Sequence, residues 1–129
     1  MTGLDTNLLV RYFLADDPDQ HRAAADHIES DKADGFFVSE VVLCELVWVL
    51  REAYRASRED IVTTLSELLE TPLFVFSNRD RLYRALSKYA SGRGDFSDYL
   101  IGLQAIEAGC ETTLTFDKAL HPDPHFTAA

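Results

Sequence analysis

Short apolar runs separated by longer amphipathic stretches make up most of the chain, and this pattern predicts alternating strands and helices. An apolar entry leads to Asp5 and predicts a first buried strand, which a helix follows at once. Further strands are predicted over residues 36–38, 73–76 and 112–116, and a fifth strand near Phe126 has a weaker pattern.

Residues that commonly cap helices mark the predicted helix boundaries. Asp17 and Pro18 predict a helix that runs to about Glu29 and packs peripherally through a small apolar face. Other helices are predicted from Thr6 to Leu14, after Ser39, from Ser57 to Thr71, from Ser77 to Gly92, and from Asp95 or Ser97 to Gly109. Residues 30–35 are predicted to form a polar loop.

This alternation predicts an α/β fold with a mainly parallel sheet of four or five strands, covered by helices on both faces. A length of 129 residues suits one domain over residues 1–129, and we find no linker or internal repeat.

One acid interrupts an otherwise apolar helix. Between Val41 and Leu50 every residue except Glu45 is apolar or cysteine, which predicts a helix that is buried all round. A lone buried carboxylate costs several kcal/mol unless it is paired or binds a metal. Glu45 is therefore a metal ligand, the partner of an internal arginine, or a side chain that points out through a gap.

Three more acids lie where a parallel sheet would bring them to the same rim. Asp5 and Asp117 follow predicted strands, and Asp98 opens a helix, where capping alone could also explain an acid. Together with Glu45 they make four carboxylates, which would repel one another, and a divalent cation removes that conflict. Oxygen ligands select Mg²⁺ or Mn²⁺, and such a site suits phosphodiester hydrolysis.

Other chemistries have less support in the sequence. Cys44 and Cys110, in predicted apolar helical surroundings, lack the neighbours that a zinc site needs. His21 and His27 are expected on an exposed helix face, and His121 and His125 lie alone in the tail. No glycine-rich phosphate or dinucleotide loop is present, and Ser39 and Ser97 are interpreted as caps.

The net charge of −10 and the isoelectric point of about 4.6 disfavour a general nucleic-acid binder. The distribution of the charges along the chain matters more than their sum. Five of the twelve basic residues lie between positions 79 and 93. They form either a solvated helix face or a stripe that contacts phosphate. The candidates for contact with nucleic-acid phosphate are Arg11, Arg79, Arg81, Arg84, Lys88 and Arg93. Such contact would weaken steeply with salt.

The two cysteines do not resemble a disulfide framework, which favours a reducing cytoplasmic setting. We find neither a signal peptide nor an apolar run long enough to cross a bilayer, so no membrane association is expected.

Four motifs in order carry a family resemblance. G-L-D-T-N-L-L-V, S-E-V-V-L-C-E-L, D-F-S-D-Y-L-I-G and T-F-D-K together resemble a PIN domain, and most of all the VapC-type toxins of toxin–antitoxin pairs. The resemblance spans nearly the whole chain. It implies a PIN-like three-layer α/β/α fold and a Mg²⁺- or Mn²⁺-dependent endoribonuclease, whose substrate would be a structured RNA such as tRNA or rRNA.

The resemblance also implies roles for single residues. Asp5, Glu45, Asp98 and Asp117 match the family's catalytic, metal-binding quartet. The family's supporting residues correspond to Thr6, Asn7 and Thr115 in this chain. Asp95 matches an acid present in part of the family. The implied partners are a VapB-type antitoxin, whose carboxyl-terminal segment wraps the toxin and blocks the site, and a second copy in a homodimer.

Two alternatives accompany this interpretation. A catalytically silent PIN module would bind partners only, and the full quartet argues against it. A phosphoaspartate or receiver-type domain would need an acid pair after the first strand, where this chain has Asp5-Thr6-Asn7.

Overall fold

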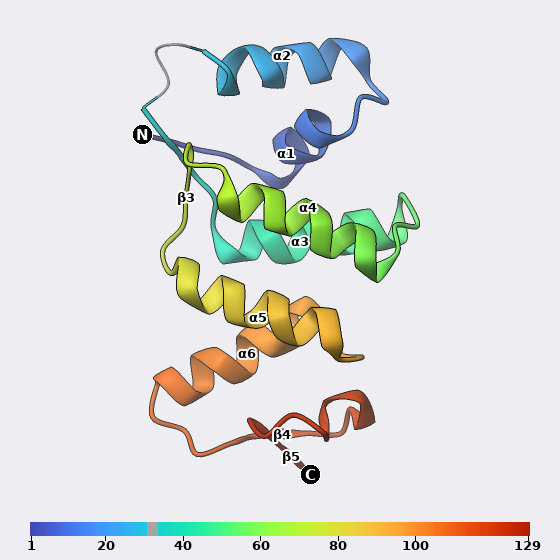
Figure 1. Ribbon diagram of the computed structural model, residues 1–129, viewed down its shortest axis with the longest axis vertical. Coiled ribbons are helices and arrows are strands. Elements are labelled where there is room, and N and C mark those ends of the chain that lie inside the picture. The colour runs from blue at the N-terminus through green and yellow to red at the C-terminus, as the bar shows by residue number, and fades with distance from the viewer. Residues whose placement is uncertain (31–33) are drawn as a thin grey trace. The chain divides into compact units, whose positions relative to one another are not determined.

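The computed structural model describes residues 1–30 and 34–129, in two compact units (Figure 1). The first unit comprises Met1–Ser77 and the second comprises Asn78–Ala129. Part of the predicted loop 30–35, residues 31–33, lies outside the described residues. The prediction of a single domain over residues 1–129 stays a prediction, and each unit is described below by itself.

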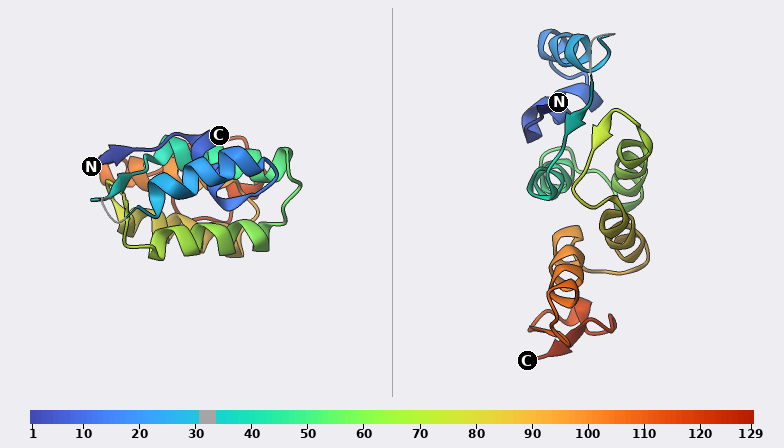
Figure 2. Two further views of the ribbon diagram at one scale, coloured as in Figure 1. Left: turned by 90° about the horizontal axis from the view of Figure 1, so that it is seen from above. Right: turned by 90° about the vertical axis from the view of Figure 1, so that its left-hand side faces the viewer.

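The first unit contains a parallel sheet of three short strands (Figure 2). Its strands are β1 (Thr2–Gly3), β2 (Phe36–Phe37) and β3 (Phe74–Val75), hydrogen-bonded in that order. Thr2 pairs with Phe36, and Phe36 pairs with Phe74. The expectation of a buried first strand is wrong because both residues of β1 are exposed, and burial begins at Leu4.

The described residues of the first unit also form four helices, and each begins after a capping side chain. They are α1 (Thr6–Phe13), α2 (Pro18–Ile28), α3 (Glu40–Glu52) and α4 (Arg58–Glu70). Their caps, Asp5, Asp17, Ser39 and Ser57, each accept a hydrogen bond from a backbone N–H in the first turn. The caps Asp17, Ser39 and Ser57 confirm the sequence prediction, because N-capping depends on local sequence. The capping role of Asp5 was not predicted. Figure 1 shows α3 and α4 side by side.

Helix α3 is buried on one face only. Leu43, Leu46, Val47 and Leu50 are buried, whereas Val41 is 69% exposed and Trp48 is 58% exposed. Glu45 lies on the exposed side with them. The predicted all-round burial is therefore wrong, because an apolar residue type permits burial without requiring it.

The second unit pairs two helices and a small parallel sheet. It contains α5 (Arg79–Ser91), α6 (Phe96–Glu107), β4 (Thr113–Thr115), the 3-10 helix η1 (Lys118–Leu120) and β5 (Phe126–Ala128). Strand β5 confirms the weaker fifth-strand pattern, and it pairs with β4 through Thr113 and Phe126. Asn78 caps α5, one residue after the predicted Ser77, because its side chain accepts from Arg81 N.

Aromatic and aliphatic side chains form the core of the second unit. Leu82, Leu86 and Tyr89, predicted as one face of α5, are all buried. The ring of Tyr89 meets that of Phe96 edge to face, with centroids 6.2 Å apart. These contacts join α5 to α6. No helix among the described residues combines the length and apolar character needed to cross a membrane.

Gly102 gives a test of how β5 packs against α6. A Cβ atom at Gly102 would lie 2.8 Å from two ring carbons of Phe126. Alanine normally stabilises a helix interior by about 0.5–1 kcal/mol relative to glycine, but overpacking a core costs about 1–3 kcal/mol. We therefore expect Gly102→Ala to lower the free energy of unfolding, measured by urea denaturation.

The matched control is Gly3→Ala, where an added Cβ has no atom within 4 Å outside its chain neighbours. Its stability should stay close to that of the unmodified protein. A Gly102→Ala protein as stable as this control, or more stable, would contradict the packing of Phe126 on α6.

Candidate active site

Asp5 lies at the junction between β1 and α1, where its side chain caps the helix. Its Oδ1 accepts a hydrogen bond from the backbone N–H of Leu8 at 2.9 Å. The carboxylate is exposed, and Oδ2 makes no hydrogen bond among the described residues of its unit. One oxygen therefore fixes the orientation of the side chain and the other remains available to a ligand.

Thr6 links the start of α1 to Glu45 on α3. Its Oγ1 donates a hydrogen bond to Glu45 Oε1 at 3.0 Å, across 39 residues of sequence. This bond brings Glu45 to the residue next to Asp5. It also leaves Oε2 of Glu45 without a hydrogen bond among the described residues of this unit.

Asn7 and Asp5 line a cavity of about 310 Å³ beside α1 and α2. The other lining residues are Leu8, Arg11, Gln20, Ala23, Ala24 and His27. Asn7 is exposed and therefore accessible to a ligand in this cavity. Its supporting role stays a prediction.

In the second unit, Asp95 and Asp98 hold the start of α6. They form a reciprocal capping box, in which each side chain accepts from the other residue's backbone N–H. The distance from Asp95 N to Asp98 Oδ2 is 3.2 Å. Asp95 is therefore the N-cap, one of the two predicted, and Asp98 is half-buried in the first turn.

Asp117 caps the 3-10 helix η1 just after β4. Its Oδ1 accepts from Ala119 N at 2.9 Å, and Thr115 Oγ1 accepts from the backbone N–H of Asp117 at 3.0 Å. Thr115 thus orders the backbone that carries Asp117. The supporting role that the resemblance implies for Thr115 stays a prediction.

The donor chemistry of these acids fits a hard divalent cation. Asp5, Glu45 and Asp117 each have one oxygen held by a hydrogen bond and one without such a bond in their own unit. Carboxylate oxygens are the ligands that Mg²⁺ and Mn²⁺ prefer. Within either unit, the described residues place no three His, Cys, Asp or Glu side chains together as a metal-binding group. The convergence of all four acids stays a prediction.

Most of the candidate RNA-contact residues are paired with acids. Arg81 Nε donates to Glu107 at 2.7 Å, and Arg84 contacts Asp80 at 3.2 Å. The first-unit candidate Arg11 donates to Asp16 and Gln20. These pairs give each residue a structural role, and its contact with RNA stays a prediction.

The two cysteines and the histidines of α2 differ in exposure. Burial raises the pKa of Cys44 to about 11, with the nearby Glu40 and Glu45 acting in the same direction, so this thiol stays protonated at neutral pH. Cys110 is exposed after α6, so its expected apolar helical surroundings are wrong. His27 is exposed as predicted. His21 is half-buried and not exposed as predicted, and its Nδ1 lies 2.8 Å from the carbonyl oxygen of Arg11.

Sequence reasoning missed the contact between Thr6 and Glu45. The sequence indicated Thr6 only through its position beside Asp5, and 39 residues separate it from Glu45. The unusual Glu45 in an apolar run was the available signal that this helix position has a polar partner.

Comparison with known proteins gives two matches. Residues 4–121 match the family described as PIN domain. The chain is also 29% identical over 120 residues to a protein named VapC ribonuclease from Aquifex aeolicus (strain VF5), covering 92% of this chain and 88% of that protein. The two matches confirm the resemblance and the PIN-like α/β/α fold class predicted from the sequence.

The capping box at the start of α6 can be separated from any catalytic role of Asp95. Asp95→Ala removes the cap acceptor and should lower the free energy of unfolding by about 1 kcal/mol, whereas Asp95→Ser retains a capping oxygen. Thermal and urea unfolding would measure both. If Asp95→Ala and Asp95→Ser have equal stability, the side chain of Asp95 does not cap α6.

Proposed function

This chain belongs to the PIN domain family, and we propose that it is a divalent-metal-dependent endoribonuclease of the VapC type. The bond from Thr6 Oγ1 to Glu45 Oε1 carries the proposal, because it brings a second acid to the helix start that Asp5 caps. The similarity to a protein named VapC ribonuclease along 92% of the chain supports the same activity.

In this proposal Asp5, Glu45, Asp98 and Asp117 hold Mg²⁺ or Mn²⁺. When bound, such an ion polarises a phosphodiester oxygen and makes water a stronger nucleophile. The protein contributes by fixing its own carboxylates in advance. Thr6 orients the carboxylate of Glu45, and Thr115 holds the backbone at Asp117.

The same resemblance supports our proposals for the binding partners of this protein and for its cellular compartment. The substrate would be a structured RNA such as tRNA or rRNA, and a VapB-type antitoxin would inhibit the protein in the cytoplasm. We also propose a homodimer. With a net charge of −10, binding of RNA must depend on local basic groups, because the protein as a whole repels a polyanion.

A silent PIN module is the main alternative. The acidic quartet disfavours it. Three of its members, Asp5, Glu45 and Asp117, each keep one oxygen available to a cation, which a module that only binds partners does not need. The receiver-type alternative has no support in the structure, where Thr6 and Asn7 follow Asp5 instead of a second acid.

Cleavage of total cellular RNA by the purified, antitoxin-free protein tests the function. We expect discrete fragments with Mg²⁺ or Mn²⁺ and none with a chelator. Asp98→Asn should reduce the cleavage rate by more than about 100-fold, because it removes a ligand charge while its amide oxygen can still cap α6. Gel analysis of the fragments and circular dichroism of the variant would measure both effects.

Asp5→Ala serves as a second inactivating variant. Cleavage that survives Asp5→Ala would indicate contamination or a wrong site, and unchanged cleavage by Asp98→Asn would remove Asp98 from the mechanism. Metal binding without cleavage of any RNA would favour the silent module.

Thr6 offers a test of how Glu45 is oriented. Thr6→Val keeps the side-chain shape but removes the donor to Glu45, so we expect activity at limiting Mg²⁺ to fall about 10–100-fold. Thr6→Ser, which keeps the hydroxyl, should retain most of the activity. A titration with Mg²⁺ would separate weaker metal binding from a slower reaction at saturation. Equal metal dependence for Thr6→Val and Thr6→Ser would show that this hydrogen bond does not serve the site.

A further inference from the structure

The cavity of about 310 Å³ beside Asp5, called here the α1–α2 cavity, has no ligand in the proposed function. Pockets for small organic ligands have volumes from about 300 Å³ upward. Its lining combines apolar side chains with two amides, those of Asn7 and Gln20. Apolar surface with a few polar groups is typical of a site that binds a small organic ring.

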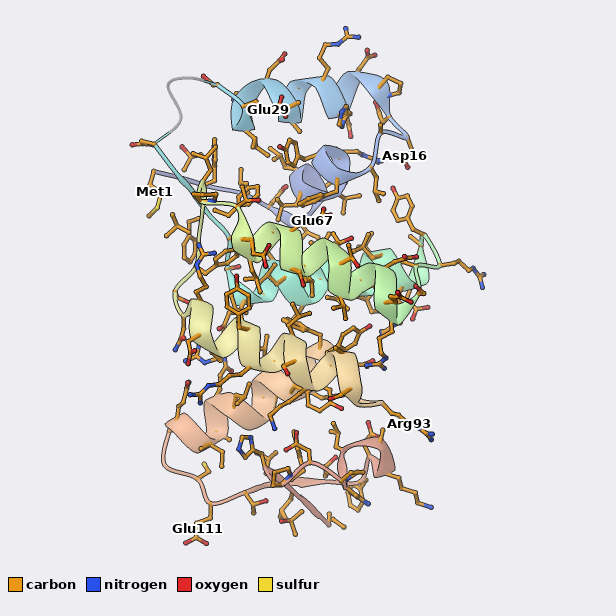
Figure 3. The ribbon with its side chains drawn as sticks, in the orientation of Figure 1. Met1, Asp16, Glu29, Glu67, Arg93 and Glu111 are labelled. Atoms are coloured by element: carbon orange, nitrogen blue, oxygen red, sulfur yellow. The ribbon has the colours of Figure 1, made fainter. Side chains whose placement is uncertain are left out.

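A chain of hydrogen bonds holds Gln20 in one orientation. Tyr54 Oη donates to Asp16 Oδ2 at 2.7 Å, and Arg11 Nη1 donates to Asp16 Oδ1 at 2.9 Å. Arg11 Nε in turn donates to Gln20 Oε1 at 2.8 Å. Figure 3 shows Asp16, the centre of this chain, at the connection between α1 and α2. The amide of Gln20 is therefore oriented before any ligand enters.

The contact with Arg11 decides what Gln20 presents to a ligand. An arginine side chain has only hydrogen-bond donors, so the amide atom that faces it is the oxygen. The two hydrogens on Gln20 Nε2 have no acceptor among the described residues of this unit. Gln20 therefore lines the cavity as a donor.

The charges around the cavity disfavour an anion. The hydrogen bond from Tyr54, and then that from Arg11, lowers the pKa of Asp16, so Asp16 stays ionised beside Arg11 at neutral pH. Asp5 adds a second carboxylate, in the lining itself. Because one arginine faces two acids, the cavity suits a neutral ligand better than a phosphate group.

An unpaired RNA base is a neutral ring whose edges carry hydrogen-bonding groups, and single-stranded RNA is recognised through such edges. Guanine and uracil present a carbonyl oxygen, O6 or O4, where adenine and cytosine present an amino group. A donor such as Gln20 Nε2 complements the carbonyl oxygen, whereas an amino group would face a second donor. The orientation of Gln20 thus favours guanine or uracil.

We propose that the α1–α2 cavity binds the nucleobase next to the scissile phosphate, and that Gln20 selects a base with a carbonyl oxygen, uracil or guanine. This inference rests on the proposed nuclease function, which makes RNA the ligand. Asp5 lines the cavity and is also a proposed metal ligand, so a base held here belongs to a nucleotide at the cut. The cavity would thereby determine where the RNA is cleaved.

The experiment compares the binding of fluorescently labelled oligouridylate and oligocytidylate by anisotropy, with Mg²⁺ present. Their pyrimidine rings are equal in size, and uracil has a carbonyl oxygen where cytosine has an amino group. The full chain carries Asp98→Asn throughout, so that RNA is not consumed. Gln20→Glu is the test variant. Gln104→Glu is the matched control, the same change at an exposed residue of α6 outside the cavity.

Gln20→Glu should preserve the fold. Gln20 is the third residue of α2, whose N-cap is Asp17, and glutamate is favourable at that position. Its carboxylate can still accept from Arg11, while its second oxygen replaces the donor in the cavity by an acceptor. Thermal unfolding would compare the stability of both variants with that of the parent.

We expect the parent, without either glutamine substitution, to bind oligouridylate at least about fivefold more tightly than oligocytidylate, the lower end of what a bidentate base contact contributes. Gln20→Glu should reverse this preference. Gln104→Glu should keep the parent's ratio of affinities. When the active protein cleaves RNA of random sequence, the fragment ends should show the same preference at one position beside the cut, and Gln20→Glu should reverse it there too.

Equal ratios of affinities for Gln20→Glu and Gln104→Glu would overturn the proposal, as would a parent without any preference. The nuclease and the base pocket fail separately. If the unmodified chain cleaves no RNA but Gln20→Glu reverses the binding preference, the nuclease alone is refuted. If the chain cleaves RNA with random bases beside the cut and Gln20→Glu changes nothing, the base pocket alone is refuted.

Discussion

Hydrogen bonds from helix N-terminal amides to acidic side chains position most of the candidate site. The first turn of a helix leaves backbone N–H groups without intrahelical partners, and a carboxylate satisfies them while the helix dipole favours its charge. Asp5 does this for α1, Asp95 and Asp98 for α6, and Asp117 for η1. The need to satisfy backbone donors and the need to present carboxylate oxygens are therefore met by the same side chains.

This shared role explains why so much was predictable from local sequence. Capping depends on residues three or four positions apart, so the starts of α2, α3 and α4 at Asp17, Ser39 and Ser57 were recognisable without tertiary information. The four-motif resemblance gave the fold class and the acidic quartet, and the family match confirms the fold class.

Features that depend on distant contacts were harder to predict. The sequence of α3 contains no information on which of its apolar residues meet other helices, so the exposure of Val41 and Trp48 was missed. The partner of Glu45 is 39 residues away at Thr6, and the contact of Arg11 with Gln20 depends on how α1 and α2 pack. Each of these features arises from side chains that are brought together only in the folded chain.

The capping geometry has a consequence for how such a protein can change during evolution. Asparagine caps a helix about as well as aspartate does. A single Asp-to-Asn change at Asp5 or Asp117 would thus remove the charge of a proposed metal ligand while the helix start keeps its acceptor. Natural selection for a folded chain would not detect such a loss. Under the proposed function, descendants that fold without being active are therefore only one substitution away, and such decoys would compete for the proposed inhibitor.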